Sequence, residues 1–239
     1  MVNLRDEQVL REMNLYPVWV RRSVPIQQQP MVKQIVNPPA IPLDVPLEVP
    51  HPSMGVDISQ LAWTGLKQQV ASCKVCKLRA GCEQTVFGGG DEQADWLFIG
   101  EDPSVEEEAP GKLLVNMLAA IQLKRGVKVY QTTVVKCKPS EAHTLGEDEI
   151  GQCLPYLHRQ IALLNPTLIV ALGKVAAAAL LGKEGALASL RGTVHDYQGI
   201  PLVVTYHPAY LLRMPNEKAQ AWKDLCFAVD TMNKVSKLS

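Results

Sequence analysis

Along residues 56–239, segments whose hydrophobic residues have helical spacing alternate with short hydrophobic runs, and this pattern predicts helices and strands in alternation. Hydrophobic residues recur every three or four positions in the segments expected to be helices, which are 57–71, 111–123, 147–164, 174–182 and about 217–235. Short hydrophobic runs predict strands within 94–102, 129–136, 167–173 and 201–208. Strands that alternate with crossover helices favour an α/β fold with a central parallel sheet and helices on both faces.

The ends of the predicted strands carry the residues of greatest chemical interest. In open parallel sheets, functional groups collect at the carboxyl ends of the strands. These ends are expected at Gly100-Glu101, Lys136-Cys137, Gly173 and His207. The sequence therefore predicts that a functional site, if present, lies along this edge of the sheet.

Two segments of different character precede the globular domain predicted over 56–239. Residues 1–22 form a short arm, in which a helical pattern ends at Pro17. Residues 23–55 contain eight of the seventeen prolines and no Phe, Tyr or Trp, which predicts an extended linker. The expected organisation is an arm, a proline-rich linker and one α/β domain.

Composition narrows the classes of function only slightly. The formal net charge is zero, so any contact with DNA must come from a local group of basic residues. No segment approaches the roughly 18 uninterrupted apolar residues of a membrane span, and the first residues lack the features of a signal peptide. We therefore expect a soluble, cytoplasmic protein without a membrane partner.

The cysteine spacing is the strongest chemical signal in the chain. A C-x2-C pair and a second, more widely spaced pair can form one site of four thiolates, composed of Cys73, Cys76, Cys137 and Cys153. Such a site suits zinc or an iron–sulfur cluster alike. Cys82 could substitute as a ligand but is expected to be a spare, and Cys226 is expected to lie in the core.

The motifs around these cysteines resemble one enzyme family. F-I-G-E-D-P, V-V-K-C-K-P, C-L-P-Y-L, P-T-L-I-V-A-L-G, L-R-G and T-Y-H-P-A-Y-L-L-R-x-P occur in the order seen in iron–sulfur uracil-DNA glycosylases of family four. The resemblance covers about residues 60–228. It implies a three-layer α/β/α, uracil-DNA glycosylase-like fold. It also implies a 4Fe-4S cluster, with the same four cysteines at the family's ligand positions.

The same resemblance indicates departures at the catalytic motifs. The family's segment with the aromatic that stacks on a flipped uracil has no counterpart here, because Gly111 runs directly into Lys112. Thr133 falls on the family's asparagine, and a hydroxyl cannot offer the paired donor and acceptor of an amide. These departures predict a non-catalytic domain. If the domain is active, the resemblance implies Glu101 and His207 as its catalytic residues.

One loop matches the family's DNA-contacting loop. Its residues that could wedge against a duplex or touch phosphate are His207, Leu211, Leu212 and Arg213. By contrast, the acidic run Glu106–Glu108 would repel phosphate, which further favours a non-enzyme.

The arm resembles a second family, the psi subunit of the bacterial DNA polymerase III clamp loader. The resemblance rests on L-R-E-M-N-L-Y-P-V-W-V-R-R and covers only about twenty residues. It implies docking on the clamp-loader ATPase subunits through Leu10, Leu15, Trp19, Arg21 and Arg22. The globular domain would then hold the chi subunit, and through it single-strand-binding protein.

We therefore expect a non-catalytic, psi-like replication adaptor. The main alternative is a divergent iron–sulfur uracil-DNA glycosylase that acts in base excision repair. A third hypothesis is an iron–sulfur DNA sensor, which would bind DNA in a salt-sensitive manner without turnover.

Overall fold

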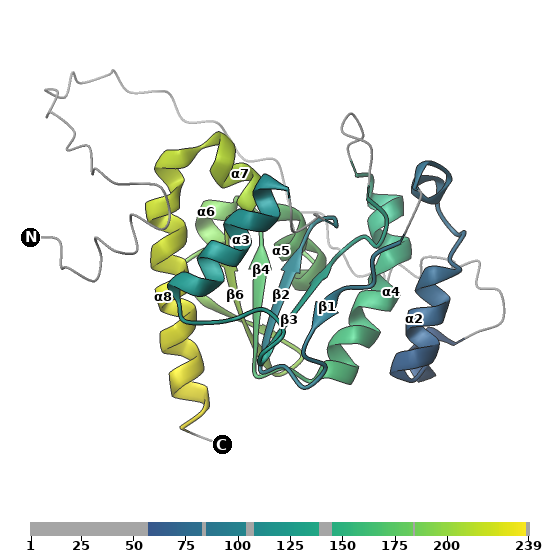
Figure 1. The fold of residues 1–239 in the computed structure, drawn as a ribbon, viewed down its shortest axis with the longest axis horizontal. Helices are drawn as coiled ribbons and strands as arrows, with labels where there is room; N and C mark the ends of the chain where they lie inside the picture. The colour runs from purple at the N-terminus through teal and green to yellow at the C-terminus, as the bar shows by residue number, and fades with distance from the viewer. Residues whose placement is uncertain (1–56, 83–84, 104–107, 139–144, 184, 238–239) are drawn as a thin grey trace, which may run out of the picture.

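The computed structural model describes residues 57–82, 85–103, 108–138, 145–183 and 185–237 (Figure 1). The arm and the linker expected over 1–22 and 23–55 lie outside the described residues, so the partner residues expected in the arm do as well.

The centre of the domain is one six-stranded sheet with the order β1-β3-β2-β4-β6-β5 (Figure 1). Its strands are β1 (Gly89–Gly90), β2 (Trp96–Gly100), β3 (Val129–Thr133), β4 (Leu168–Leu172), β5 (Val194–Tyr197) and β6 (Ile200–Thr205). The four middle strands are parallel, as predicted, whereas β1 and β5 pair antiparallel at the two edges. The sheet is therefore mixed rather than wholly parallel.

Burial explains why the middle strands read as continuous hydrophobic runs. Every residue of β2 and of β4 is buried. A parallel strand covered by helices on both faces has no polar side, so its sequence does not alternate. The two strands missed by the sequence patterns are the edges: β1 has only two residues, and β5 is mostly exposed or half-buried.

Helices cover both faces of the sheet and give the expected three-layer α/β/α fold (Figure 1). The core on one face includes residues of α3 (Ala109–Ala120), α7 (Pro208–Arg213) and α8 (Lys218–Val235). The core on the other face includes residues of α4 (Glu147–Leu164), α5 (Lys174–Leu181) and α6 (Leu187–Leu190). Outside this layer, α2 (Trp63–Ala71) lies beside α4.

Local chemistry sets several element boundaries. The first turn of α4 holds three acidic residues, which favour the positive end of the helix dipole. Helix α4 ends at Asn165, whose φ of 44° is left-handed. The turn between β5 and β6 has positive φ at both Gln198 and Gly199, as a two-residue hairpin loop requires. The helix expected over 57–71 is split into the 3₁₀ turn η1 (Ile58–Gln60) and α2.

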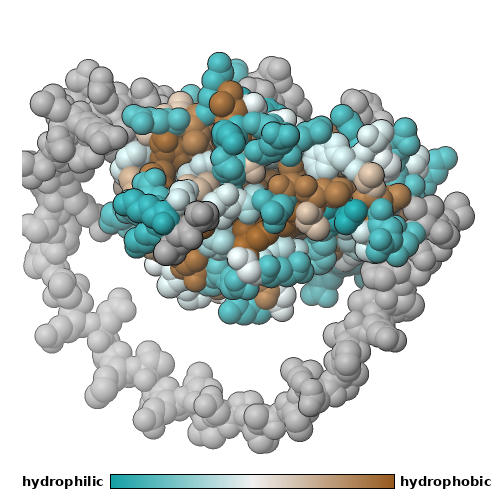
Figure 2. All heavy atoms as spheres, turned by 90° about the horizontal axis from the view of Figure 1, so that it is seen from below, coloured by the Kyte–Doolittle hydropathy of each residue, from teal (hydrophilic) through white to brown (hydrophobic). Residues whose placement is uncertain are grey.

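Two short 3₁₀ turns complete the described elements, η2 (Lys77–Gly81) beside the cysteines and η3 (Pro215–Glu217) before α8. Seen from below, hydrophilic residues cover much of the surface, and hydrophobic residues appear between them (Figure 2). Within the described ranges, every helix is too short or too polar to cross a membrane.

Candidate functional site

A cavity of about 110 Å³ lies at the carboxyl ends of the parallel strands. Its floor is formed by side chains of one face of the sheet, on β2, β3 and β4. Phe98 pairs with Gln131 and Gly100 pairs with Thr133, so these positions lie side by side on adjacent strands. The residues that line the cavity are Val86, Gly88, Gly89, Phe98, Gly100, Asp102, Pro103, Leu114, Arg125, Gln131, Thr132, Thr133, Leu172, His207 and Pro208.

His207 is held in the cavity by the start of α7. It is the N-cap of that helix, and the backbone N–H of Ala209 donates to its Nδ1 over 3.3 Å. Because Nδ1 accepts this hydrogen bond, the proton of the neutral ring is on Nε2, the nitrogen nearer to Gly100. Burial and, to a smaller extent, the charge of Arg213 together lower the pKa of His207 to about 4. His207 is therefore a neutral hydrogen-bond donor at pH 7.

Gly173 allows His207 to occupy this place. Its φ is +94°, a conformation that favours glycine. A Cβ added to Gly173 would lie 3.0 Å from the Cβ of His207, closer than nearly all real contacts. The strand-end glycine found in the sequence thus provides room for the histidine of the next strand.

Two acidic residues follow β2, and only one of them lines the cavity. The sequence favoured Glu101 as the acid of an active site, but Asp102 is the lining residue. Asp102 follows Gly100 by two positions, the spacing at which extended backbone returns to the same side. Burial raises the pKa of both carboxyl groups. The Asp102 charge raises the pKa of Glu101 further, whereas Arg213 lowers it.

The polar side chains of β3 differ in their freedom to contact a ligand. The hydroxyl of Thr133 donates to the carbonyl oxygen of Val135 over 2.6 Å. Thr132 Oγ1 bonds to the Phe87 carbonyl and accepts from Lys136 Nζ. Gln131 lines the cavity, and its buried Nε2 has no hydrogen-bond partner among the described residues. Gln131 was missed by sequence reasoning, although its place two residues before Thr133 puts it on the same face.

The residues of the expected DNA-contacting loop differ in their exposure to solvent. Leu211 is completely buried in the core beneath α7, so it does not fit the predicted role of a DNA wedge. Its neighbour Leu212 is 39% exposed, and Arg213 is exposed as well. The helical spacing explains the difference, because one side of α7 must cover the sheet. Leu212 and Arg213 remain available for contact.

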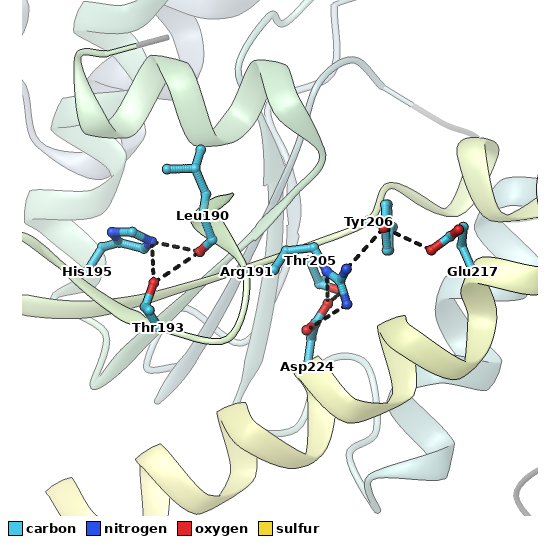
Figure 3. A network of polar contacts seen from close by, with 8 residues as sticks. All are labelled: Leu190, Arg191, Thr193, His195, Thr205, Tyr206, Glu217 and Asp224. Atoms are coloured by element: carbon cyan, nitrogen blue, oxygen red, sulfur yellow. Dashed lines mark hydrogen bonds and ion pairs between the residues drawn. The ribbon is translucent and has the colours of Figure 1, made fainter. Parts of the chain in front are cut away.

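A partly buried polar network holds Thr205 and Tyr206, the two residues that precede His207 in the chain (Figure 3). Arg191 Nε donates to Asp224 Oδ2 over 2.6 Å, and its Nη2 donates to Oδ1 over 3.1 Å. Thr205 Oγ1 donates to the same carboxylate over 2.8 Å. Arg191 Nη1 donates to the hydroxyl of Tyr206 over 3.0 Å, and that hydroxyl donates to Glu217 over 2.9 Å. The L-R-G motif thereby anchors the end of β6 to α8.

The four cysteines predicted as ligands come from three separate segments. Cys73 and Cys76 lie in the short loop between α2 and η2, Cys137 follows β3, and Cys153 lies on α4. Burial raises the pKa of Cys153 to about 11, and the Cys76 and Cys73 thiols raise it too. Burial also raises the pKa of Cys137, as do Cys82, Cys76 and Cys153. The thiols are therefore near enough to interact electrostatically.

The donor chemistry of four thiols suits a zinc ion or an iron–sulfur cluster alike. In the part of the chain that the structure describes, no three His, Cys, Asp or Glu side chains are grouped closely enough to hold a metal ion. In a 4Fe-4S cluster each cysteine binds a different iron, so the four sulfurs are farther apart than those around one ion. Cys82 is buried, and its thiol lies near enough to Cys137 to raise the pKa of that residue.

Lys136 lies between the cysteines and the cavity. It is 3% exposed, and its Nζ donates to Thr132 Oγ1 over 2.8 Å and to the Thr133 carbonyl over 2.7 Å. A third bond of 2.5 Å goes to Gln160 Oε1. Burial lowers the pKa of Lys136 to about 7. The lysine fixes the end of β3 from the side opposite to the cavity floor.

Fold and site together define an α/β/α domain with a small polar cavity at its strand ends and a group of cysteines beside it. The sequence profile of the uracil DNA glycosylase superfamily matches residues 87–228, and the chain belongs to this superfamily.

Curated relatives include several enzymes of one type. The chain is 35% identical to the Type-4 uracil-DNA glycosylase of Pyrobaculum aerophilum over 176 residues, which are 67% of this chain and 89% of that protein. It is 37% identical to the Type-4 uracil-DNA glycosylase of Sulfurisphaera tokodaii over 167 residues, or 63% and 76% of the two chains. A third, from Archaeoglobus fulgidus, is 31% identical over 173 residues, or 66% and 86%.

These relatives overturn the main functional prediction. They are named as glycosylases and cover most of the α/β domain, so the prediction of a non-catalytic, psi-like clamp-loader subunit is wrong. The predicted partnership with clamp-loader ATPase subunits, chi and single-strand-binding protein falls with it. The alternative, a DNA repair glycosylase, is the better-supported reading. Differences from the family's motifs at single positions, such as Thr133, therefore do not establish that the whole site is lost.

Proposed function

We propose that this protein is a uracil-DNA glycosylase, which hydrolyses the bond between uracil and deoxyribose in DNA. The observation that carries the proposal is one cavity lined by both a half-buried carboxyl group, Asp102, and a neutral imidazole, His207. The relatives named as Type-4 uracil-DNA glycosylases support it.

The size of the cavity suits a single flipped base. Its volume of about 110 Å³ is below the roughly 300–1,000 Å³ of pockets that hold drug-sized ligands. Enzymes that act on a base must take it out of the stack and enclose it in a fitted pocket. The sheet floor, with Phe98 and Leu172, supplies an apolar contact for such a ring.

The two polar groups match the charges that develop when the bond breaks. The electron pair of the C1′–N1 bond moves into the base, so negative charge appears on the uracil oxygens and positive charge on the sugar. The Nε2–H of His207 can donate to the developing oxyanion. The Asp102 carboxylate can stabilise the positive sugar and accept a proton from the water that adds to C1′.

Exposed groups around α7 would hold the DNA. Arg213 is near enough to His207 and Glu101 for its charge to shift their pKa values, so its charge lies close to the cavity. An exposed arginine can bind a phosphate next to the flipped nucleotide. Leu212 and Met214 are exposed on the same segment and can contact the neighbouring bases.

The test is excision of uracil from a duplex that contains one U·G pair, with product strands separated after alkaline cleavage. We expect turnover by the wild-type protein and a fall in kcat of about 100-fold for Asp102→Asn, since a positioned proton acceptor contributes about that much or more. Asp196→Asn is the matched control, because Asp196 is an exposed aspartate on the edge strand β5. A wild-type protein without turnover on this duplex contradicts the proposed function.

We further propose that Cys73, Cys76, Cys137 and Cys153 hold a 4Fe-4S cluster. The cysteine donors and their separation on three segments support this assignment. The cluster would cross-link the loop after α2 to β3 and α4, and it would convert the protonated thiols to thiolates. Residues of the cavity, not the cluster, carry the glycosylase chemistry proposed above.

Loss of one proposed ligand is expected to remove the cluster. Cys153→Ala should abolish the visible absorbance and the iron content of protein purified without oxygen, because a cluster needs all its protein ligands. Cys226→Ala is the matched control, since Cys226 lies on α8, outside the proposed set. Equal iron in Cys153→Ala and in wild type would exclude Cys153 as a ligand.

A further inference from the structure

We propose that Gln131 reads the polar edge of the flipped base and supplies the amide that position 133 lacks. The inference rests on the proposed function and names the recognition residue of that same site. It also specifies the ligand chemistry: a base with a carbonyl oxygen on the edge opposite to its glycosidic bond.

A residue that reads the base must lie on the surface of the cavity, and Gln131 does so. Gln131 and Thr133 are two residues apart on β3, and in a strand such residues face the same side. Both line the cavity. On the neighbouring strands Gln131 pairs with Phe98 and with Gly89, and these two residues also line the cavity. The amide therefore belongs to the floor of the pocket and not to its rim.

Such a residue must also offer a polar group that can bond to the base, and the amide nitrogen of Gln131 can do this. Nε2 of Gln131 is buried, and within the described ranges no acceptor bonds to it. Buried polar groups in folded proteins nearly always have a partner, so each exception calls for an explanation such as a functional role or a bound water or ion. Of the three such atoms among the described residues, only Gln131 Nε2 belongs to a residue that lines the cavity. An N–H group held in this way can donate to a carbonyl oxygen of a base.

Neighbouring side chains on β3 are already engaged. The Thr133 proton goes to the Val135 carbonyl. Thr132 Oγ1 is bonded to Phe87, Gln160 and Lys136 on the opposite side of the strand. Among the described residues that line the cavity, Gln131 alone carries a side-chain amide.

The spacing along the strand fits the dimensions of a pyrimidine. Nε2 of His207 lies near Gly100, which pairs with Thr133. Two residues along a strand span about 6.6 Å, so Gln131 lies roughly one ring farther from His207 than Thr133 does. A uracil whose glycosidic end is at His207 therefore directs its far edge, with the 4-oxo group, toward Gln131.

The experiment combines turnover with binding. Turnover uses the U·G duplex, and binding uses a matched duplex with 2′-fluoro-2′-deoxyuridine, which resists hydrolysis. We expect Gln131→Leu to lower kcat/KM about 10- to 100-fold, the usual effect of losing a buried hydrogen bond to a ligand. Its affinity for the fluorinated duplex should fall similarly, while its affinity for a normal duplex stays within about twofold. Thermal unfolding and visible absorbance check that the variant is folded.

Two further variants distinguish recognition of the base from packing. Thr133→Asn, added to Gln131→Leu, places an amide on the same floor and should restore most of the lost uracil affinity. Gln131→Glu replaces the N–H donor by an acceptor and should weaken uracil binding at least as much as Gln131→Leu. Unchanged uracil affinity in both single variants would overturn the inference. If the wild type has no turnover but binds the fluorinated duplex more tightly than Gln131→Leu does, the proposed function fails and the inference stands.

Discussion

Replacement of His207 by alanine is expected to lower kcat for uracil excision about 100- to 1,000-fold, the usual effect of removing one preorganised donor to a developing oxyanion. The substitution removes the Nε2–H that faces the cavity beside Gly100. It leaves the sheet floor and Asp102 in place, so substrate binding should change much less than kcat. Single-turnover rates on the U·G duplex measure the chemical step directly.

The matched control is His195→Ala, because His195 lies on β5 and is not among the residues that line the cavity. Its kcat should remain close to that of the wild type. Equal rates for His207→Ala and the wild type would show that the imidazole only holds the loop.

The pH dependence of stability reports independently on the state of His207. Burial lowers the pKa of His207 to about 4 from an ordinary value of 6.5. Between these two pH values the unfolded chain binds more protons than the folded one, so the free energy of unfolding falls as the pH falls through this window. His207→Ala should lose less stability over the same range. His158, whose pKa burial also lowers, contributes with the same sign in both proteins.

The sequence was most informative where one local rule determines the structure. Hydrophobic runs at 96–100 and 168–172 identified the buried parallel strands, because strands covered on both faces lack polar alternation. The predicted strand ends included Gly100, Gly173 and His207, and in the structure both glycines lie next to His207. The edge strands were missed, since β1 is too short and β5 too exposed to give a pattern.

The site was less predictable because its residues depend on register between strands. Comparison with the family's motifs drew attention to Thr133 and to a missing aromatic, and hence to a non-enzyme. That comparison considers one position at a time. The cavity instead combines side chains from β2, β3 and the loop before α7, including Asp102 and Gln131. Such a combination depends on which strands pair and on which face of the sheet each side chain lies, and a linear motif specifies neither.

The cysteines illustrate the same difference. Their spacing predicted a single site, which stays a prediction; Cys76 and Cys153 lie near enough to Cys137 to raise its pKa. The burial of Cys82 next to Cys137 did not follow from spacing, because it depends on how η2 turns the chain between Cys76 and Cys82.

Replacement of Asp224 by alanine is expected to lower the free energy of unfolding by about 3–5 kcal/mol, the usual cost of leaving one member of a buried ion pair unpaired. The side chains of Arg191 and Asp224 are only 12% and 4% exposed. Without the carboxylate, the guanidinium charge stays buried and Thr205 loses its acceptor. Chemical denaturation at pH 7 measures the loss.

Two comparisons distinguish this charge effect from ordinary truncation. Asp95→Ala removes the partner of Lys128 in an exposed pair of 3.3 Å and should cost less than about 1 kcal/mol. The double variant Arg191→Met, Asp224→Leu removes both charges and should be more stable than either single variant. Because Thr205 and Tyr206 directly precede His207, Asp224→Ala should also lower kcat at temperatures where it remains folded. A loss for Asp224→Ala no larger than that for Asp95→Ala would mean that water reaches the pair and that α8 does not anchor the histidine loop.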